Sequence, residues 1–347
     1  MPVCDSEAYL REAIDSILSQ TFTDFEFLII SEHSANAESM RIIESFRDRR
    51  IRHLKNARRL GLARSLNRGL KESNGEYIAR MDADDVSMQG RLEIQLRFLD
   101  EHPDVGVVGS GSIVIDENGA VLSARSEPSS PSLTAWRLLL GDVVAHPSVM
   151  VRAKIYRELG GYDPSALHAE DYELWIRATQ KTDIVNLPDI LIKLREHKTK
   201  VSQMHATIQR RNAAAISRRA IESLIGRKIS SATHRFLYFH SSVGGKAAFD
   251  AAKTFHTMCF QYMERTDSSR EDRKLIKNDA AHRLWTLALL CAGSYPFTSI
   301  RILLLILRSN PSYLPILLTA TMQRAGRRFS RCLRRELTFG GQQLESK

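Results

Sequence analysis

The sequence predicts an α/β fold with a mostly parallel sheet, followed by a C-terminal helical region. Up to residue 200, short apolar runs alternate with amphipathic segments of helical length, which is typical of βαβ units with right-handed crossovers. Beyond residue 200 the strand-like runs stop and only helical periodicity continues. We therefore expect an α/β domain over residues 1–200 and a mainly helical region over residues 201–347.

The helices of the first region are predicted from apolar residues at helical spacing. Leu10, Ile14 and Ile17 lie on one face of a helix over 6–20, and Ser6 is its expected N-cap. Further helices are expected over 37–47, 60–73, 88–101 and 169–179.

Short apolar runs between these helices predict the strands. They are expected over 25–30, 51–55, 76–82, 105–109 and 149–151, with two short strands around Pro188 over 184–194. Residues 113–122 predict a hairpin with an Asn118-Gly119 turn, and residues 127–132, rich in Ser and Pro, predict a loop.

The second region is predicted to be basic and helical. Helices are expected over 203–225, 247–264 and 274–290. Residues 300–322 predict two short apolar helices with basic flanks. Their apolar runs are below the roughly 18 residues that a transmembrane helix needs and fit an interfacial segment better.

Charge separates the two regions. Residues 1–200 carry 26 Lys and Arg against 31 Asp and Glu, whereas residues 201–347 carry 24 against 9. The basic region predicts an anionic partner, and an anionic membrane surface is favoured. A nucleic acid is not expected, because aromatic residues are not interleaved with the Arg residues as base stacking would require.

Composition and cysteine usage favour a folded protein of a reducing compartment. The chain has 347 residues with 43% hydrophobic and 26% charged, as in globular domains. Its four cysteines have neither metal-ligand nor disulfide spacing, and its first residues do not resemble a signal peptide. We expect a cytoplasmic protein that is peripheral at the inner membrane face.

The acidic segment Asp82-Ala83-Asp84-Asp85 is the first candidate site. It directly follows a predicted strand, and ligands of open α/β sheets bind beyond the carboxyl ends of the strands. Side chains alternate along extended backbone, so Asp82 and Asp84 are expected on one side, where they can address one Mg2+ or Mn2+ ion. The alternative is an acidic turn that caps the next helix, although capping needs only one Asp.

The second candidate is Glu170-Asp171, at the start of a predicted helix. The helix dipole keeps a carboxylate there ionised, and a general base could be presented to a hydroxyl at this position. Helix capping alone is the alternative. Two weaker candidates are the glycine- and arginine-rich segment 57–67, which suits phosphate, and His146 before a strand. A solvated basic face and a structural histidine are their respective alternatives.

Taken together, these segments resemble the family 2 glycosyltransferases, which are inverting enzymes with the GT-A fold. The resemblance covers residues 1–200. It is carried, in order, by Met1-Pro2-Val3 with Ser6-Glu7, Ala13-Ile14 with Ser16 to Phe22, Phe25 to Ile30, Gly61-Leu62-Ala63, Asn67, Gly75 to Asp85, His146-Pro147-Ser148, Gly160-Gly161-Tyr162-Asp163, and Glu170 to Arg177.

The resemblance implies roles for individual residues. Asp82 and Asp84 match the Asp-x-Asp motif that places the metal and the nucleotide-sugar diphosphate, and Asp171 matches the catalytic base. The remaining nucleotide-sugar contacts are implied at Pro2, Val3, Glu32, Arg64 and Ala83, with support from Asp85, His146 and Glu170.

The implied reaction moves a sugar from a UDP-sugar to a hydroxyl of a saccharide or lipid-linked acceptor, in the synthesis of cell-surface polysaccharide or glycoconjugate. Asp171 would take the proton of the hydroxyl as it attacks the anomeric carbon, which inverts. The metal would neutralise the leaving nucleoside diphosphate.

The chain departs from the family pattern at two places. It begins inside the segment that the family usually precedes with a full apolar strand, so we expect the true start upstream or a shortened first strand. Ser31-Glu32-His33-Ser34 stands where the family usually has Asp-Asp-Gly-Ser. Glu32 keeps a carboxylate for the uracil N3–H, while His33 replaces a glycine.

Two other functions are alternatives for this sequence. A nucleotidyltransferase shares the metal carboxylates but needs a Gly-rich, Lys-containing loop after its first strand, and Cys4-Asp5-Ser6-Glu7 does not provide one. A catalytically degenerate transferase-like domain could serve as a membrane-associated assembly partner. The early start and the altered Ser31-Glu32 favour it, whereas the intact Asp82, Asp84 and Asp171 oppose it.

Overall fold

The computed structural model describes residues 1–4, 7–126, 130–239, 244–310 and 313. The chain forms two compact units. The first unit is Met1–Gly226 and the second is Arg227–Lys347. The division falls 26 residues beyond the predicted boundary at residue 200, after two helices. The reason is that α9 (Ala206–Ile225) is bonded into the first unit, where Ser217 donates to the Leu139 carbonyl at 2.7 Å and Asn212 to the Leu167 carbonyl at 2.8 Å.

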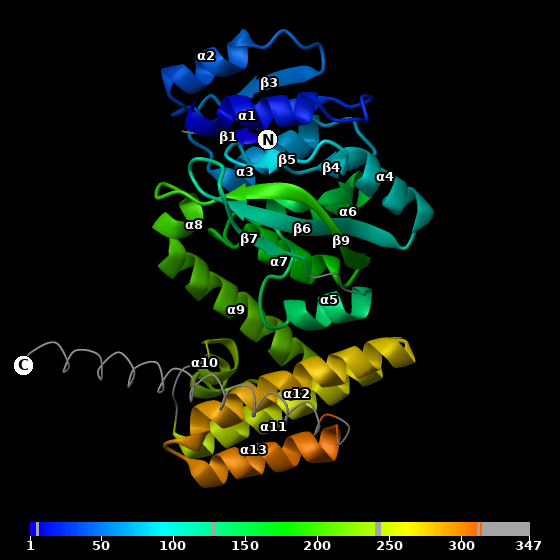
Figure 1. Cartoon of the computed structure of the whole chain (residues 1–347), viewed down its shortest axis with the longest axis vertical. Coiled ribbons are helices and arrows are strands. Elements are labelled where there is room, and N and C mark those ends of the chain that lie inside the picture. The colour runs from blue at the N-terminus through cyan, green and yellow to red at the C-terminus, as the bar shows by residue number, and fades with distance from the viewer. Residues whose placement is uncertain (5–6, 127–129, 240–243, 311–312, 314–347) are drawn as a thin grey trace, which may run out of the picture. The chain divides into compact units, whose positions relative to one another are not determined.

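The first unit begins with a small parallel sheet. Its strands β1 (Pro2–Val3), β2 (Phe27–Ser31) and β3 (Ile51–Lys55) pair in that order. Helices α1 (Glu7–Leu18) and α2 (Ala37–Ser45) connect them, and α3 (Leu62–Glu72) follows β3 (Figure 1). The predicted helices and strands of this part are confirmed. Ser6, the expected N-cap of α1, lies outside the described residues.

The second sheet of the first unit is mixed, in the order β4-β8-β6-β9-β5, with β7 paired to β6. Its strands are β4 (Tyr77–Ala79), β5 (Val86–Ser87), β6 (Val105–Ile115), β7 (Val121–Arg125), β8 (Met150–Arg152) and β9 (Asp183–Arg195). Only β6 and β9 pair in parallel here. The expected mostly parallel pairing therefore holds for the first sheet and for this central pair, because β8 is reached through the β6–β7 hairpin and not through a single crossover helix.

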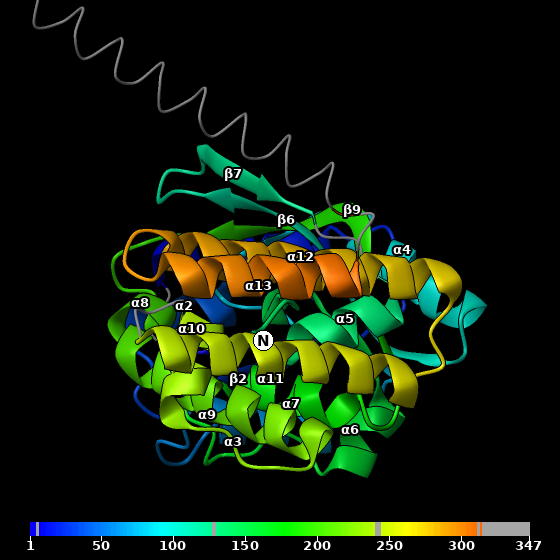
Figure 2. The same cartoon turned by 90° about the horizontal axis from the view of Figure 1, so that it is seen from below.

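The predicted hairpin is confirmed, and Gly119 in its turn has a φ of 86°. Figure 2 shows this β6–β7 hairpin projecting from the sheet. The two short strands expected around Pro188 form one strand, β9. Its register with β6 jumps from Leu187 to Ile190, so Pro188 sits in a bulge where its missing N–H costs no ladder hydrogen bond.

Several short elements were missed by the sequence analysis. Helix α5 (Pro131–Leu138) begins within the predicted 127–132 loop, with Ser130 accepting from the Leu133 N–H at 3.3 Å. Residues 127–129 of that loop lie outside the described part. The other missed elements are β5, the 3-10 turn His146–Ser148, α6 (Ala153–Leu159) and α10 (Ser231–Phe239). Each is too short for its apolar spacing to stand out from chance.

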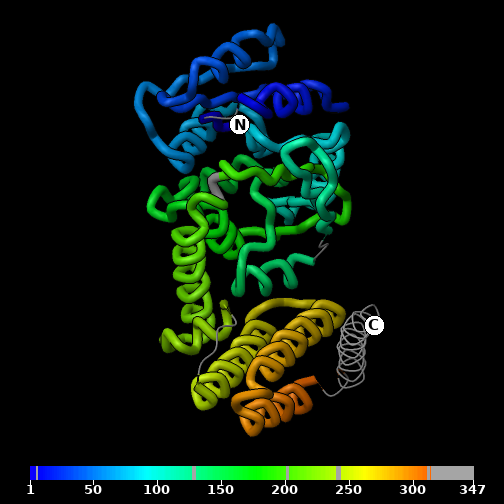
Figure 3. Tube along the Cα trace, turned by 60° about the vertical axis from the view of Figure 1, so that its left-hand side comes forward, coloured from blue at the N-terminus to red at the C-terminus, as the bar shows by residue number. Residues whose placement is uncertain are grey.

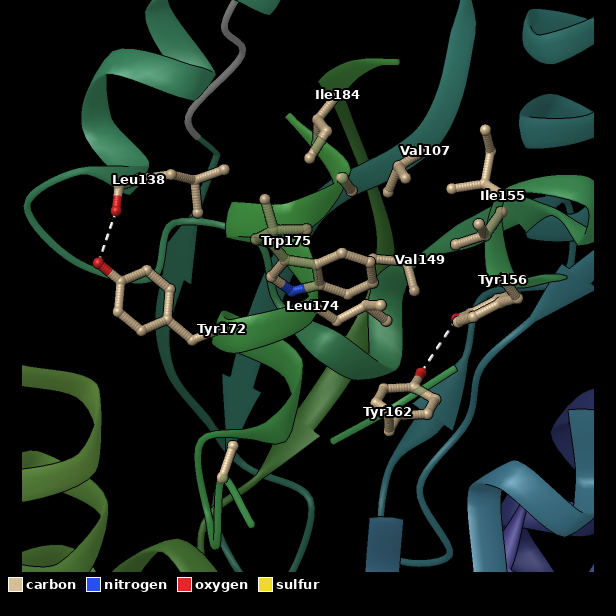
Figure 4. Close-up of a cluster of buried hydrophobic side chains, with 14 of the residues drawn as sticks. Val107, Leu138, Val149, Ile155, Tyr156, Tyr162, Tyr172, Leu174, Trp175 and Ile184 are labelled. Carbon is tan, nitrogen blue, oxygen red and sulfur yellow. Dashed lines mark hydrogen bonds between the residues drawn. The ribbon is translucent and has the colours of Figure 1, made fainter. Parts of the chain in front are cut away.

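The core of the first unit surrounds Trp175 of α7 (Glu170–Ala178). Figure 4 shows Trp175, fully buried, packed among side chains that include Val107, Val149 and Ile155. Tyr172, on the same helix, donates to the Leu138 carbonyl at 2.5 Å. The packing of these side chains determines where the N-terminus of α7, with Glu170 and Asp171, lies. The neighbouring helix α4 (Arg91–Glu101) covers the other side of β6, and α8 (Val201–Met204) precedes α9.

The second unit consists of helices in its described part. Helices α11 (Gly245–Arg265), α12 (Arg270–Ala292) and α13 (Pro296–Ser309) follow α10 and pack on one another, as the yellow-to-orange tube in Figure 3 shows. The predicted helices over 247–264 and 274–290 are confirmed. The second apolar helix expected near Ile316 lies outside the described residues. None of the helices that the structure describes combines the length and apolar character that a bilayer span requires.

We predict that Trp175→Ala lowers the free energy of unfolding of the first unit by about 3–5 kcal/mol, because a fully buried indole is replaced by a cavity. Urea unfolding followed by circular dichroism measures the change. The matched control is Leu122→Ala on β7, whose side chain is 59% exposed and which should change stability by no more than about 0.5 kcal/mol. Equal losses in both variants would contradict this assignment of the core.

Candidate active site

The first unit contains two groups of carboxylates, one in the segment between two strands and one at the start of a helix. Asp82, Asp84 and Asp85 lie between β4 and β5, while Glu170 and Asp171 open α7. Met81 and Ala83 are buried in the core beneath the first sheet, and Asp82 and Asp84 are half-exposed. The alternation of side chains predicted for this segment is thus present, with Asp82 and Asp84 on the same side.

The three aspartates form one cluster, because a carboxylate oxygen from each lies within 4.8 Å of the others. Each has a cationic or donor partner. Arg80 pairs with Asp82, and His197 Nε2 lies 2.9 Å from Asp84 Oδ2. The Arg195 N–H donates to Asp85 Oδ1 at 2.8 Å. The structure therefore brings together the predicted metal-site residues.

Asp85 is the least balanced member of the cluster. It is 1% exposed, its Oδ2 has no hydrogen-bond partner, and Lys200 Nζ remains 4.0 Å from Oδ1. Burial, together with repulsion from Asp82 and Asp84, raises the pKa of Asp85 to about 8. The acidic cluster thus keeps one buried oxygen without a hydrogen-bond donor. Its all-oxygen donor set therefore fits a divalent cation such as Mg2+ or Mn2+.

Arg80 is the buried cation beside the cluster. Its side chain is 6% exposed and forms an ion pair with Asp82. The backbone of Arg80 is held by the fully buried Arg91, which donates to the Arg80 carbonyl at 2.7 Å and to the Val149 carbonyl at 3.0 Å. This arrangement connects β4 to the segment that carries His146.

Asp171 lies beside His146, the weaker candidate of the sequence analysis. His146 Nδ1 is 3.8 Å from Asp171 Oδ2, and His146 Nε2 is 2.8 Å from the Tyr162 hydroxyl. Tyr162 in turn lies 3.0 Å from the Tyr156 hydroxyl (Figure 4). Burial lowers the pKa of His146 well below its usual range, and nearby Arg80 acts in the same direction, so the imidazole is neutral at pH 7.

The two carboxyl groups at the start of α7 are both harder to ionise than in water. Burial raises the pKa of Asp171. Glu170 is 6% exposed, and burial followed by repulsion from Asp171 raises its pKa to about 7. Perturbed carboxyl groups at the end of a packed helix are typical of a catalytic site.

Asn67 is hydrogen-bonded to the Gly160-Gly161-Tyr162 segment. Asn67 Nδ2 donates to the Tyr162 carbonyl at 2.8 Å, and the Tyr162 N–H donates to Asn67 Oδ1 at 2.8 Å. Gly161 has a φ of 76°, and a Cβ there would come within 2.4 Å of Asn67 Oδ1. Glycine is therefore required where Asn67 fixes the tyrosine that contacts His146.

The residues expected to contact the nucleotide lie around β1 and α3. Val3 is buried and accepts from the Glu32 N–H at 2.8 Å, Pro2 is half-exposed, and Arg64 is exposed in the first turn of α3. His33 does not adopt a positive φ, so its replacement of glycine causes no backbone strain.

The carboxylate of Glu32 is already engaged by the chain. Its Oε1 accepts from Asn56 at 3.1 Å and from the Ser65 hydroxyl, and its Oε2 accepts from the Leu60 N–H at 2.9 Å. Glu32 therefore anchors the segment between β3 and α3. One lone pair of Oε2 is left, since each carboxylate oxygen can accept two hydrogen bonds.

Sequence analysis missed Arg80, Arg195 and His197 as members of the site. His197 and Arg195 are more than a hundred positions from the acidic cluster, and β9 delivers them to it. No local pattern around them indicates this proximity. Arg80 lies within the Gly75 to Asp85 motif, and its position two residues before Asp82 could have suggested an ion pair.

Comparison with known proteins identifies the family of the chain. The model of "Glycosyl transferase family 2" matches residues 1–160. An uncharacterised glycosyltransferase of Methanocaldococcus jannaschii is 34% identical over 197 residues, covering 55% of this chain and 67% of that protein. The O-antigen biosynthesis glycosyltransferase WbnJ of Escherichia coli is 30% identical over 201 residues, covering 57% and 78%. The chain belongs to glycosyl transferase family 2 and is a glycosyltransferase.

The fold is confirmed by a solved structure. TarS 1–349 of S. aureus, in complex with UDP-GlcNAc, aligns with a TM-score of 0.54 at 16% identity, covering 90% of each chain. The first unit thus has a GT-A-like α/β fold, and a helical region follows it.

We predict that Glu170→Gln stabilises the metal-free protein above neutral pH. The folded pKa of about 7 exceeds the ordinary 4.5, so the folded state keeps a proton that the unfolded chain releases, and stability falls as pH rises through that interval. The variant should gain about 2–3 kcal/mol over the wild type at pH 8 and less than about 1 kcal/mol at pH 5. Urea unfolding in EDTA measures this. A gain independent of pH would contradict it, and Asp189→Asn, on the exposed bulge of β9, is the control.

Proposed function

We propose that this glycosyltransferase moves a sugar from a UDP-sugar to a hydroxyl acceptor with inversion at the anomeric carbon. The observation that carries the proposal is that one unit contains both the Asp82-Asp84-Asp85 cluster and Asp171. Arg80 interacts electrostatically with both groups. One group suits the diphosphate end of the donor, and the other suits a general base.

Asp82 and Asp84 would hold Mg2+ or Mn2+, with His197 beside Asp84. The ion, when bound, would neutralise charge on the departing nucleoside diphosphate. The chain itself prepares the site, because Arg80 and Arg195 keep the carboxylates in place through an ion pair and a backbone N–H bond. The preference for UDP is supported by the remaining acceptor position of Glu32, which suits the uracil N3–H.

Asp171 would accept the proton of the acceptor hydroxyl. The hydroxyl oxygen forms a bond to the anomeric carbon while the bond from that carbon to the diphosphate oxygen breaks, and the proton remains on the carboxylate. A single displacement inverts the carbon and needs no covalent enzyme intermediate. The raised pKa of Asp171 increases its affinity for the proton, as a general base requires.

The proposed acceptor is a saccharide or lipid-linked saccharide in the synthesis of surface polysaccharide or glycoconjugate. Support comes from WbnJ, which is named for O-antigen biosynthesis. TarS, a protein with a similar fold, is seen with UDP-GlcNAc, in line with a UDP-sugar donor.

We predict that Asp171→Asn lowers kcat by about 10²–10⁴-fold while nucleotide binding persists, because only the proton acceptor is removed. Asp84→Ala should instead abolish the metal dependence of UDP binding. Turnover of a panel of nucleotide sugars with Mn2+ or Mg2+ and calorimetric UDP titrations separate these effects.

NMR of the product from the preferred donor should show the anomeric configuration opposite to that of the donor. Asp189→Asn, an exposed carboxylate outside the site, is the control and should leave turnover unchanged. Retention of configuration, or full activity of Asp171→Asn, would refute the mechanism.

We further predict that His146 is a positioning residue for Asp171. If the Tyr162 hydroxyl donates to Nε2, the imidazole proton is on Nδ1, toward Asp171. His146→Ala should lower kcat by about 10–100-fold with little change in the donor KM, since a base displaced by about 1 Å loses about that much rate.

The same variant should move the acidic limb of the pH profile, whereas His146→Gln should recover part of the rate. Tyr156→Phe removes only the far hydroxyl of the Tyr162–Tyr156 pair and should have the smallest effect. A loss of kcat in His146→Ala with an unshifted pH profile would indicate a purely structural role.

A further inference from the structure

Helix α13 of the second unit exposes an apolar stripe. Phe297, Ile300 and Leu304 are spaced by three and four residues, so they share one face of the helix. Their side chains are 82%, 53% and 53% exposed. Such a contiguous row of exposed, large apolar side chains is unusual on a helix whose other face is already buried in a hydrophobic core.

The opposite face of α13 supplies that core. Ile302 and Ile306 are fully buried, and the helix packs against α11 and α12 (Figure 2). The stripe therefore does not contribute to the folding of the second unit, and its exposure costs free energy unless something covers it.

Arginines accompany the stripe. Arg301 and Arg308 are exposed on α13. They lie three residues before and four residues after Leu304, so both border the stripe. The Arg301 guanidinium lies 3.8 Å from the centroid of the Phe249 ring on α11. Lys253 of α11 lies over the same ring at 5.1 Å and pairs with Asp250, the acidic side chain at this edge.

The surrounding sequence is positively charged throughout. Residues 280–335 contain nine arginines and neither Asp nor Glu. The chemistry that matches an apolar stripe with flanking guanidinium groups is a surface with anionic phosphates outside and hydrocarbon beneath.

We propose that the outer face of α13 docks on an anionic phospholipid bilayer, inserting Phe297, Ile300 and Leu304 between the lipids, with Arg301 and Arg308 at the phosphates. A second copy of the chain fits less well, because apposed stripes would bring like-charged arginines together. A nucleic acid would leave the apolar stripe without a partner. This inference goes beyond the proposed catalysis and does not depend on it.

The test is flotation of the full chain with vesicles of phosphatidylcholine alone or mixed with phosphatidylglycerol, in the absence of nucleotide sugar. The wild type should float with the anionic vesicles at low salt and detach at high salt, where the charges are screened. Phe297→Gln should weaken partitioning about tenfold. Arg308→Gln should weaken it about fivefold.

The matched control is the pair Val121→Gln and Leu122→Gln. These β7 side chains are 66% and 59% exposed and lie outside the second unit, so their replacement should leave vesicle binding unchanged. Circular dichroism confirms that each variant folds. Phe297→Trp adds a direct reading, because its emission should shift to the blue and be quenched by brominated lipid only when vesicles are present.

Three results would overturn the proposal. The wild type could fail to float with anionic vesicles at low salt. The Phe297→Gln variant could bind as well as the wild type, which would leave only general electrostatic attraction. The Phe297→Trp emission could shift with protein concentration alone, which would assign the stripe to self-association. Turnover is not measured, so each result is separate from the test of catalysis.

Discussion

The buried cation Arg80 is the constraint on which the candidate active site depends. Two sets of carboxylates gather in one unit, and such an arrangement costs free energy unless positive charge lies close by. Arg80 pairs with Asp82 directly and favours ionisation of Asp171 through its charge. Arg91, fully buried itself, fixes the Arg80 backbone. Because Arg80 interacts with both groups, the position of the candidate metal-site aspartates and the electrostatics of the proposed base are coupled.

The long strand β9 completes the same site from the other side. Its bulge at Pro188 lets one strand follow β6 along its length and end with Arg195 at Asp85. His197 then reaches Asp84, and Arg195 also pairs with Glu12 of α1. The strand therefore ties the acidic segment to the second sheet and to helix α1. The spare oxygen of Asp85 persists in spite of these contacts, which is why a divalent cation suits the cluster better than one more side chain would.

Much of the fold and site could be predicted from local patterns. The alternation through Met81, Asp82, Ala83 and Asp84 is a property of neighbouring residues, so its outcome was visible in the sequence. Strand direction was not, because β8 has the same apolar pattern whether it pairs in parallel or antiparallel. His197 and Arg195 join the site through β9, and contacts over such separations leave no local signal. Glu32 was identified by resemblance, yet its bonds to Leu60 and Asn56 reveal a structural role that a motif cannot show.

The two units differ in charge, and they therefore attract ligands of opposite charge. Residues 227–347 carry 20 Lys and Arg against 8 Asp and Glu, whereas the catalytic unit concentrates carboxylates at its site. An acidic site repels anionic lipid, and a basic face attracts it. Placing the two on different compact units lets each be optimised without neutralising the other. Had the arginines of α13 lain on the catalytic unit, they would have competed for the aspartates that are available to a metal. The segregation of charge along the chain would therefore let one protein combine the proposed membrane-docking face with the candidate cation site.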